Sequence, residues 1–265
     1  TKDQALQSLL MKPNAFTKAK LRLEKKARLV TPKSGLYVIV PMEYSQSGNP
    51  PVSWFIDDLM KYLKQPYYAG LLSAAALHGS SHQAVQEFQV MTRAPLRSIQ
   101  IGRLQIKFFS KKSISTAQYS KLKTQTGSMQ ISTPEVTAFD LIRYQSSAGY
   151  VSHVATVLAE MSEKFDSKKL LAIAKQKETE LSVTQRLGFV LEEIGQKKLA
   201  EHLSRWIKSQ ETFPVPLIPG QKTQAPAKKN EKWNVIVAGA GFERDLFDRF
   251  AGPPGTAIAD LHRDL

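Results

Sequence analysis

The hydrophobic pattern of the chain changes period twice, and this constrains the fold more than any other feature. Alternation of apolar and polar residues, which is typical of strands, begins near residue 86, as in EFQVMT at 87–92. Helical spacing returns at Thr133-Pro134-Glu135, where a capping residue precedes a proline at the first helical position. A run of strands followed by a run of helices indicates an α+β fold.

The strand region predicts a small antiparallel sheet. RSIQIG and RLQIKFF meet near Gly102 as a hairpin, and SKLKT and SMQIS give two further strands. Five helical segments between residues 134 and 208 then predict a helical bundle. The Pro/Lys-rich stretch at 212–230 is expected to be a long surface loop, followed by a last strand, WNVIV.

The first forty residues predict two helices and a hairpin. DQALQSLL is the first helix, and residues 12–30 form the second, with Phe16, Ala19 and Leu23 on one apolar face. Leu29-Val30, the turn at 32–35 and LYVIV at 36–40 predict two strands. This order is that of a winged helix-turn-helix, in which the second helix of a pair enters the major groove. One more helix usually precedes such a pair, so this domain is expected to be reduced or truncated.

Positive charge is concentrated in two segments of a chain whose formal net charge is +14. Residues 1–40 hold nine Lys or Arg against two acids, and residues 93–125 hold eight Lys or Arg and no acid. Such focused charge favours a polyanionic partner over a merely solvated surface, although solvated lysines on helix faces remain the alternative for each segment.

Composition excludes several other classes. No apolar run approaches the roughly 18 residues of a membrane-spanning helix, and the first residues lack a secretory signal pattern. The chain has no cysteine, which excludes disulfides, thiolate metal sites and a cysteine nucleophile. We therefore expect a cytoplasmic protein that uses no cofactor.

Gly79-Ser80 invites comparison with the phosphate-binding Gly-Ser of nucleotidyltransferases. That chemistry needs paired aspartates for two metal ions, and the following residues contain Glu87 but no aspartate pair. We expect a helix to end at Gly79, because glycine adopts the left-handed conformation at little cost.

Other enzyme motifs are incomplete. His78 and His82 have the spacing of two zinc ligands, but no third ligand is evident. Gln105-Ile106-Lys107 has the lysine of a restriction-type nuclease motif without its acid, and VAGAGFERD at 237–245 lacks the lysine of a phosphate-binding loop. No catalytic or metal-binding residues are therefore predicted.

The order of four segments resembles the AbiEi family, the antitoxins of AbiE abortive-infection systems, which are type IV toxin-antitoxin systems. The resemblance covers about residues 12–200, and the order of the segments is more specific than any one of them. The segments are LRLEKKARLVTPKSGLYVIVP, FIDDLMKYLKQPYYAGLLSAAALHGSSHQAVQEFQVMT, STPEVTAFDLIRY and TQRLGFVLEEIG.

The resemblance implies a winged helix-turn-helix over residues 1–45 and a larger mixed antitoxin domain over 50–265. The first would bind inverted repeats in its own promoter, and the second would counter a nucleotidyltransferase toxin without a stable complex. The DNA contacts that it implies are Lys12, Asn14, Thr17, Lys18, Lys20, Arg22, Lys33 and Ser34.

A second basic surface is predicted on the larger domain, where it would extend the DNA footprint or bind another nucleic acid. Its members are Arg97, Arg103, Lys107, Lys111 and Lys112. Two alternatives stay open at this point: a nucleic-acid-binding regulator with no toxin, and a nucleic-acid-modifying enzyme.

Overall fold

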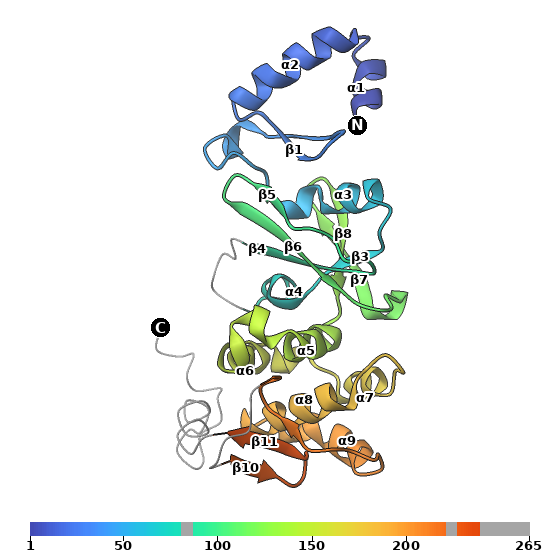
Figure 1. The fold of residues 1–265 in the computed structure, drawn as a ribbon, viewed down its shortest axis with the longest axis vertical. Helices are drawn as coiled ribbons and strands as arrows, with labels where there is room; N and C mark the ends of the chain where they lie inside the picture. The colour runs from blue at the N-terminus through green and yellow to red at the C-terminus, as the bar shows by residue number, and fades with distance from the viewer. Residues whose placement is uncertain (81–86, 221–226, 239–265) are drawn as a thin grey trace. The chain divides into compact units, whose positions relative to one another are not determined.

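The computed structural model describes residues 1–80, 87–220 and 227–238 (Figure 1). The chain divides into two compact units. The N-terminal unit is Thr1–Ala74 with Gln83–Thr133, and the C-terminal unit is Ala75–His82 with Pro134–Leu265. The described residues form helices and three sheets, so the α+β class is confirmed. The predicted boundary at residues 45–50, between a DNA-binding domain and an antitoxin domain, is not the boundary between these two units. The functional division stays a prediction.

The N-terminal unit begins with the two predicted helices and the predicted hairpin. α1 (Lys2–Ser8) is capped by Thr1, and α2 (Pro13–Lys25) starts with proline in its first turn. β1 (Leu29–Lys33) and β2 (Leu36–Ile39) pair antiparallel. The two helices bury few side chains: Phe16 is the buried residue of α2, and α1 has none.

The end of α2 is strained at Ala27. Its φ of 52° is left-handed, and Arg28 N–H bonds Leu23 O while Ala27 N–H bonds Glu24 O, the bonding pattern of a glycine-ended helix. An alanine in the left-handed conformation costs roughly 1–2 kcal/mol. A glycine avoids this cost, but it also makes the unfolded chain more flexible, which cancels part of the gain in stability.

We expect Ala27→Gly to raise the free energy of unfolding by about 0.5–1 kcal/mol in urea titrations. Ala19→Gly, inside the same helix, is the matched control and should lower it by about 1 kcal/mol. Equal losses for the two variants would contradict a strained helix end.

The sheet of the N-terminal unit differs from the prediction. It has six strands in the order β5-β6-β4-β3-β8-β7, and it is mixed, because β4 pairs parallel with β6 and β3 pairs parallel with β8. The expected small antiparallel sheet was therefore wrong, although the predicted β5–β6 hairpin is confirmed and the two further predicted strands are present as β7 and β8, which pair antiparallel. The strands are β3 (Tyr67–Ala69), β4 (Glu87–Thr92), β5 (Ile99–Ile101), β6 (Leu104–Ser110), β7 (Tyr119–Thr124) and β8 (Gly127–Ser132).

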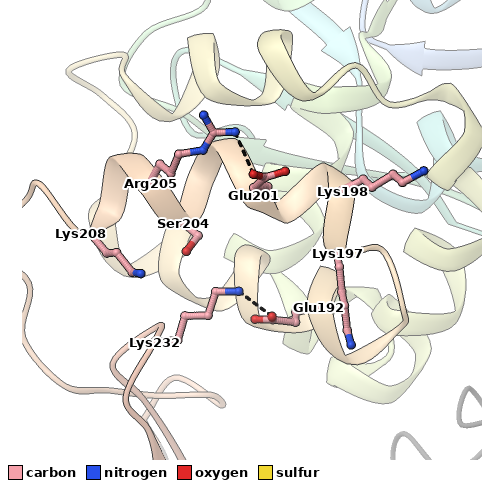
Figure 2. Close-up of a pocket in the computed structure, with 8 residues that line it drawn as sticks. All are labelled: Glu192, Lys197, Lys198, Glu201, Ser204, Arg205, Lys208 and Lys232. Carbon is pink, nitrogen blue, oxygen red and sulfur yellow. Dashed lines mark hydrogen bonds and ion pairs between the residues drawn. The ribbon is translucent and has the colours of Figure 1, made fainter.

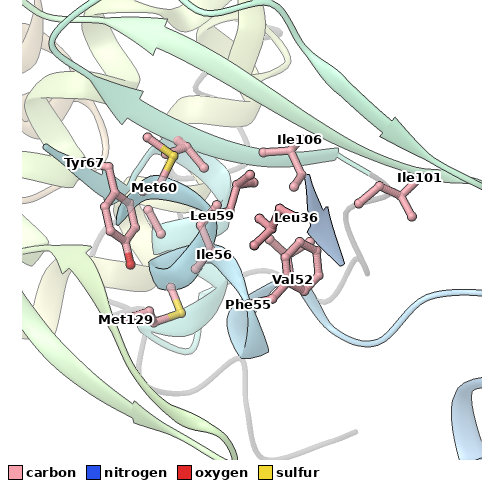
Figure 3. Packing of buried hydrophobic residues seen from close by; sticks show 12 residues of the cluster. Leu36, Val52, Phe55, Ile56, Leu59, Met60, Tyr67, Ile101, Ile106 and Met129 are labelled. Carbon is pink, nitrogen blue, oxygen red and sulfur yellow. The ribbon is translucent and has the colours of Figure 1, made fainter. Parts of the chain in front are cut away.

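One face of this sheet packs against α3 (Ile56–Tyr62), and the hairpin joins the same core (Figure 3). Leu36 of β2 lies in a cluster with Phe55, Leu59 and Ile101. The hydroxyl of Tyr62 also donates a 2.8 Å hydrogen bond to Ser34 O in the hairpin turn. The hairpin is therefore anchored to the sheet and α3, not only to α2.

α4 (Leu71–Leu77) confirms the predicted helix end at Gly79, whose φ is 85°. Gly79 N–H bonds Ala76 O at 2.9 Å and Ser80 N–H bonds Ala75 O at 2.9 Å, which satisfies the last carbonyls of the helix. The Ser80 hydroxyl is buried and donates to Glu160 Oε2 at 3.0 Å. His82 lies outside the described residues.

The C-terminal unit contains the predicted helical block and a small sheet. Pro134 is the first residue of α5, as expected. The helices are α5 (Pro134–Arg143), α6 (Tyr150–Met161), α7 (Ser167–Ala174), α8 (Leu181–Glu193) and α9 (Lys197–Ile207). Two short 3-10 turns, η4 (Gln145–Ala148) and η5 (Ser162–Lys164), belong to this unit, whereas η1 (Met42–Tyr44), η2 (Val52–Trp54) and η3 (Thr116–Gln118) belong to the N-terminal unit.

The stretch predicted as a surface loop at 212–230 is partly strand. β9 (Val215–Pro216) and β10 (Ala227–Asn230) pair on either side of β11 (Val235–Ala238), which confirms the last predicted strand. Residues 221–226 of that stretch and the end of the chain after Ala238 lie outside the described residues. Trp233, just before β11, is fully buried.

Candidate nucleic-acid interface

The outer face of α2 carries a stripe of exposed polar and cationic side chains. Asn14, Lys18 and Arg22 are four residues apart and all exposed, so they share one face of the helix. Phe16 is turned the other way and is buried. α2 therefore presents long cationic side chains to solvent, while Phe16 on the opposite side packs against the hairpin.

The N-terminal half of α2 is fixed to the hairpin through aromatic contacts. Phe16 packs edge-on against Tyr37 of β2 with ring centroids 5.4 Å apart. Lys20 Nζ lies 5.6 Å from the centre of the Tyr37 ring and 3.4 Å from Glu24 Oε1. Glu24 also accepts a 2.7 Å hydrogen bond from the hydroxyl of Thr31. These contacts join Phe16, Lys20 and Glu24 of α2 to Tyr37 and Thr31 of the hairpin.

The hairpin turn exposes Lys33 and Ser34. Gly35 follows with a φ of 86°, which strains any residue with a side chain, and a Cβ there would also displace the Tyr62 hydroxyl, which lies 2.5 Å away. The hairpin packs against α2 through Tyr37 and against the sheet and α3 through Leu36. Lys33 and Ser34 therefore project from a turn whose position is fixed.

The eight predicted DNA contacts all lie on α2, at its start or in the hairpin turn, but they differ in exposure. Seven are exposed, namely Lys12, Asn14, Thr17, Lys18, Arg22, Lys33 and Ser34. Lys20 is only partly exposed and is already paired with Glu24 and Tyr37. Lys20 is therefore less available to a ligand than its neighbours, and the role of all eight residues stays a prediction.

The second predicted basic surface is spread along one hairpin. Arg97 precedes β5, Arg103 is in the β5–β6 turn, and Lys112 follows β6; these three are exposed. Lys107 is paired with Glu87 at 3.4 Å, and Lys111 donates to the Tyr68 hydroxyl at 3.1 Å. β6 separates its two ends by about 20 Å, so these residues form two cationic ends rather than one patch.

Two acids that the sequence places near helices or basic strands, Glu87 and Asp57, are paired with neighbouring side chains. Glu87 lies across β4 and β6 from Lys107, a pairing invisible in the sequence because the two residues are twenty positions apart. Asp57 bonds Lys61 at 2.6 Å and the Tyr67 hydroxyl at 3.0 Å. Over residues 1–80, 87–220 and 227–238, no three His, Asp or Glu side chains gather as metal ligands would. In the same ranges, no helix is long and apolar enough to cross a bilayer.

The fold is similar to that of a solved protein. The RV2827C protein from Mycobacterium tuberculosis is 12% identical to this chain, with a TM-score of 0.62, covering 89% of this chain and 85% of that one. An antigenic nucleotidyltransferase-like protein from Paracoccidioides brasiliensis gives a TM-score of 0.37 at 13% identity, covering 57% of this chain and 90% of that one. No curated protein sequence matches the chain.

Residues 68–193 match the family model described as the AbiEi antitoxin C-terminal domain. The resemblance to the AbiEi family drawn from the sequence is therefore confirmed over residues 68–193. The match begins at β3 and ends with α8, so it includes most of the six-stranded sheet and four of the five helices between residues 134 and 207.

Proposed function

We propose that the chain is a DNA-binding autorepressor and the antitoxin of a type IV toxin-antitoxin system. α1, α2 and the β1–β2 hairpin act as part of a winged helix-turn-helix, in which α2 enters the major groove of the promoter and the hairpin is the wing. The antitoxin domain opposes a cognate nucleotidyltransferase toxin without forming a stable complex with it, and it is not itself an enzyme.

The observation that carries the proposal is the exposed stripe of α2 held beside an exposed hairpin turn. Lys18 and Arg22 can neutralise phosphates, while Asn14 and Thr17 lie in the first turns, which approach base edges when a recognition helix docks. Lys33 adds a cation at the turn. The antitoxin family of residues 68–193 implies a toxin as the second partner.

Promoter binding should weaken steeply with salt. Lys12, Lys18, Arg22 and Lys33 are four exposed cations, and four phosphate contacts give a slope of about −3.6 in log affinity against log salt for each bound copy. Affinity should thus fall on the order of a hundredfold between about 50 and 200 mM salt. A gel-shift titration of the full chain with the DNA upstream of its own gene measures this slope.

The same titration with control DNA, together with a growth assay, separates the proposal from its alternatives. Equal affinity for the upstream DNA and for scrambled DNA of the same composition would contradict an autorepressor. If the chain binds its promoter but expression of the neighbouring gene does not affect growth, the result would support a regulator that has no toxin.

A further inference from the structure

A charged groove of about 430 Å³ runs along α9 in the C-terminal unit (Figure 2). One wall is α9 itself, and the other is formed by the end of α8 and the β10–β11 turn. Five cationic side chains and two carboxylates line it, together with a single serine. The lining residues are Glu192, Lys197, Lys198, Glu201, Ser204, Arg205, Lys208 and Lys232.

Both carboxylates are already neutralised within the groove. Glu192 accepts hydrogen bonds of 2.6 Å from Lys232 Nζ and from Trp233 Nε1, and Glu201 accepts one of 3.0 Å from Arg205. Burial alone would raise the pKa of Glu192, but these hydrogen bonds and the charge of Lys232 lower it below its ordinary value. Glu192 is therefore ionised at neutral pH, and its oxygens already accept hydrogen bonds from Lys232 and Trp233.

Three lysines of the groove remain available to a ligand. Lys197, Lys198 and Lys208 are exposed, and none has an ion-pair partner in the part of the chain that the structure describes. Because the acids are occupied, the groove carries an uncompensated positive charge. This favours an anionic ligand.

The spacing of the lysines favours an extended anion over a single one. Lys197, Ser204 and Lys208 lie seven and four residues apart and so share one face of α9. From the first to the last, the helix rises about 16 Å, whereas phosphates along one strand of duplex DNA are about 3.4 Å apart along the helix axis. Ser204 lines the groove and is 5% exposed. The face therefore offers a row of donors as long as several phosphates.

The lining also indicates which anion fits. No aliphatic or aromatic side chain lines the groove, so a nucleobase would have nothing to stack on. Arg205 has the planar fork that suits carboxylates, but it is paired with Glu201. Lysine point charges and a hydroxyl remain, and these suit phosphate oxygens.

We propose that the α9 groove is a second nucleic-acid site, which holds a phosphodiester backbone without reading its bases. The groove lies almost wholly beyond residues 68–193 of the antitoxin family match, and it shares no residue with α2 or the hairpin. This proposal can therefore be tested independently of promoter recognition.

The test uses the full chain carrying Lys18→Glu and Arg22→Glu, so that the α2 surface is already disabled. Fluorescence anisotropy with a labelled random-sequence single-stranded RNA, and with a random-sequence DNA duplex, measures affinity between about 50 and 200 mM salt. Adding Lys197→Glu and Lys208→Glu should reduce the salt slope by about 2 for whichever nucleic acid the groove holds, because each lysine contributes about 1. The two probes distinguish RNA from DNA.

Lys175→Glu with Lys177→Glu is the matched control, since both lysines are exposed in the same unit and lie outside the groove. The proposal is overturned if the groove variant and this control lose the same slope, or if neither probe is affected. It is also overturned if polyglutamate displaces RNA and DNA as well as unlabelled nucleic acid does. Promoter binding by the chain with an intact α2 is measured separately, so failure here leaves that proposal standing.

Discussion

Lys18→Glu combined with Arg22→Glu is expected to abolish detectable retardation of the promoter. Both side chains are exposed on the outer stripe of α2, and each should cost about 1–3 kcal/mol if it reaches a base edge, or lower the salt slope by about 1 if it contacts a phosphate. Charge reversal adds repulsion from the phosphates to the lost attraction. Competitive gel shifts against non-specific DNA distinguish the two roles, because only a base contact changes the preference for the promoter.

Arg22 is a better residue to replace than Lys20, because a change at Arg22 should affect DNA binding without disturbing the fold. Lys20→Glu would place a second carboxylate beside Glu24 and remove the contact with Tyr37, so it would disturb the fold as well as any DNA contact. Lys25→Glu with Lys26→Glu is a useful comparison, because both lysines are exposed at the far end of the same helix. Promoter affinity that survives in the Lys18/Arg22 variant, while its circular dichroism stays unchanged, would show that α2 is not the recognition helix.

Gly188→Ala is expected to lower the stability of the C-terminal unit, although it adds only one methyl group. A Cβ at Gly188 would lie 2.1 Å from Cζ3 of Trp233, whose ring is fully buried between α8 and the small sheet. Overpacking of this kind costs about 1–3 kcal/mol and occasionally more. Trp233→Ala should lower the free energy of unfolding by about 3–5 kcal/mol through the cavity it leaves. Denaturant titrations followed by circular dichroism measure both.

A double-mutant cycle tests that the cost comes from this one contact. Trp233→Leu makes room beside α8, so Gly188→Ala should cost much less in that background, with a coupling of about 0.5–3 kcal/mol. Additive losses would mean that the alanine clashes elsewhere. Trp233→Phe keeps most of the ring but removes the hydrogen bond from Nε1 to Glu192, which separates packing from hydrogen bonding.

The elements that local chemistry specifies were predicted well. Gly79 ends α4 because glycine alone reaches a left-handed φ without strain, and Pro134 begins α5 because its missing N–H is not needed there. The α2 helix and its hairpin were recognisable from the spacing of Phe16, Ala19 and Leu23 and from the turn at Gly35. Each of these signals acts within a few residues.

What the sequence did not reveal depends on distant partners. β3 is a strand of three residues directly before a helix, too short to show alternation, yet it joins β4 to β8 at the centre of the sheet. The parallel pairing of β4 with β6 likewise has no local signature. The α9 groove draws residues from α8, α9 and the turn after β10, and its only sequence signal was the helical spacing of Lys197, Ser204 and Lys208.

The anchoring of the hairpin has a consequence for dissecting the protein. Leu36 belongs to the same hydrophobic cluster as Phe55 and Ile101, and Tyr62 closes over the turn at Ser34. Cutting the chain anywhere in 41–52 would separate the hairpin from the residues it packs against, and it would expose apolar side chains of the remaining sheet and α3. The hairpin and the sheet therefore belong to one folding unit, and loss of function in a truncated variant would report misfolding rather than the role of the removed segment.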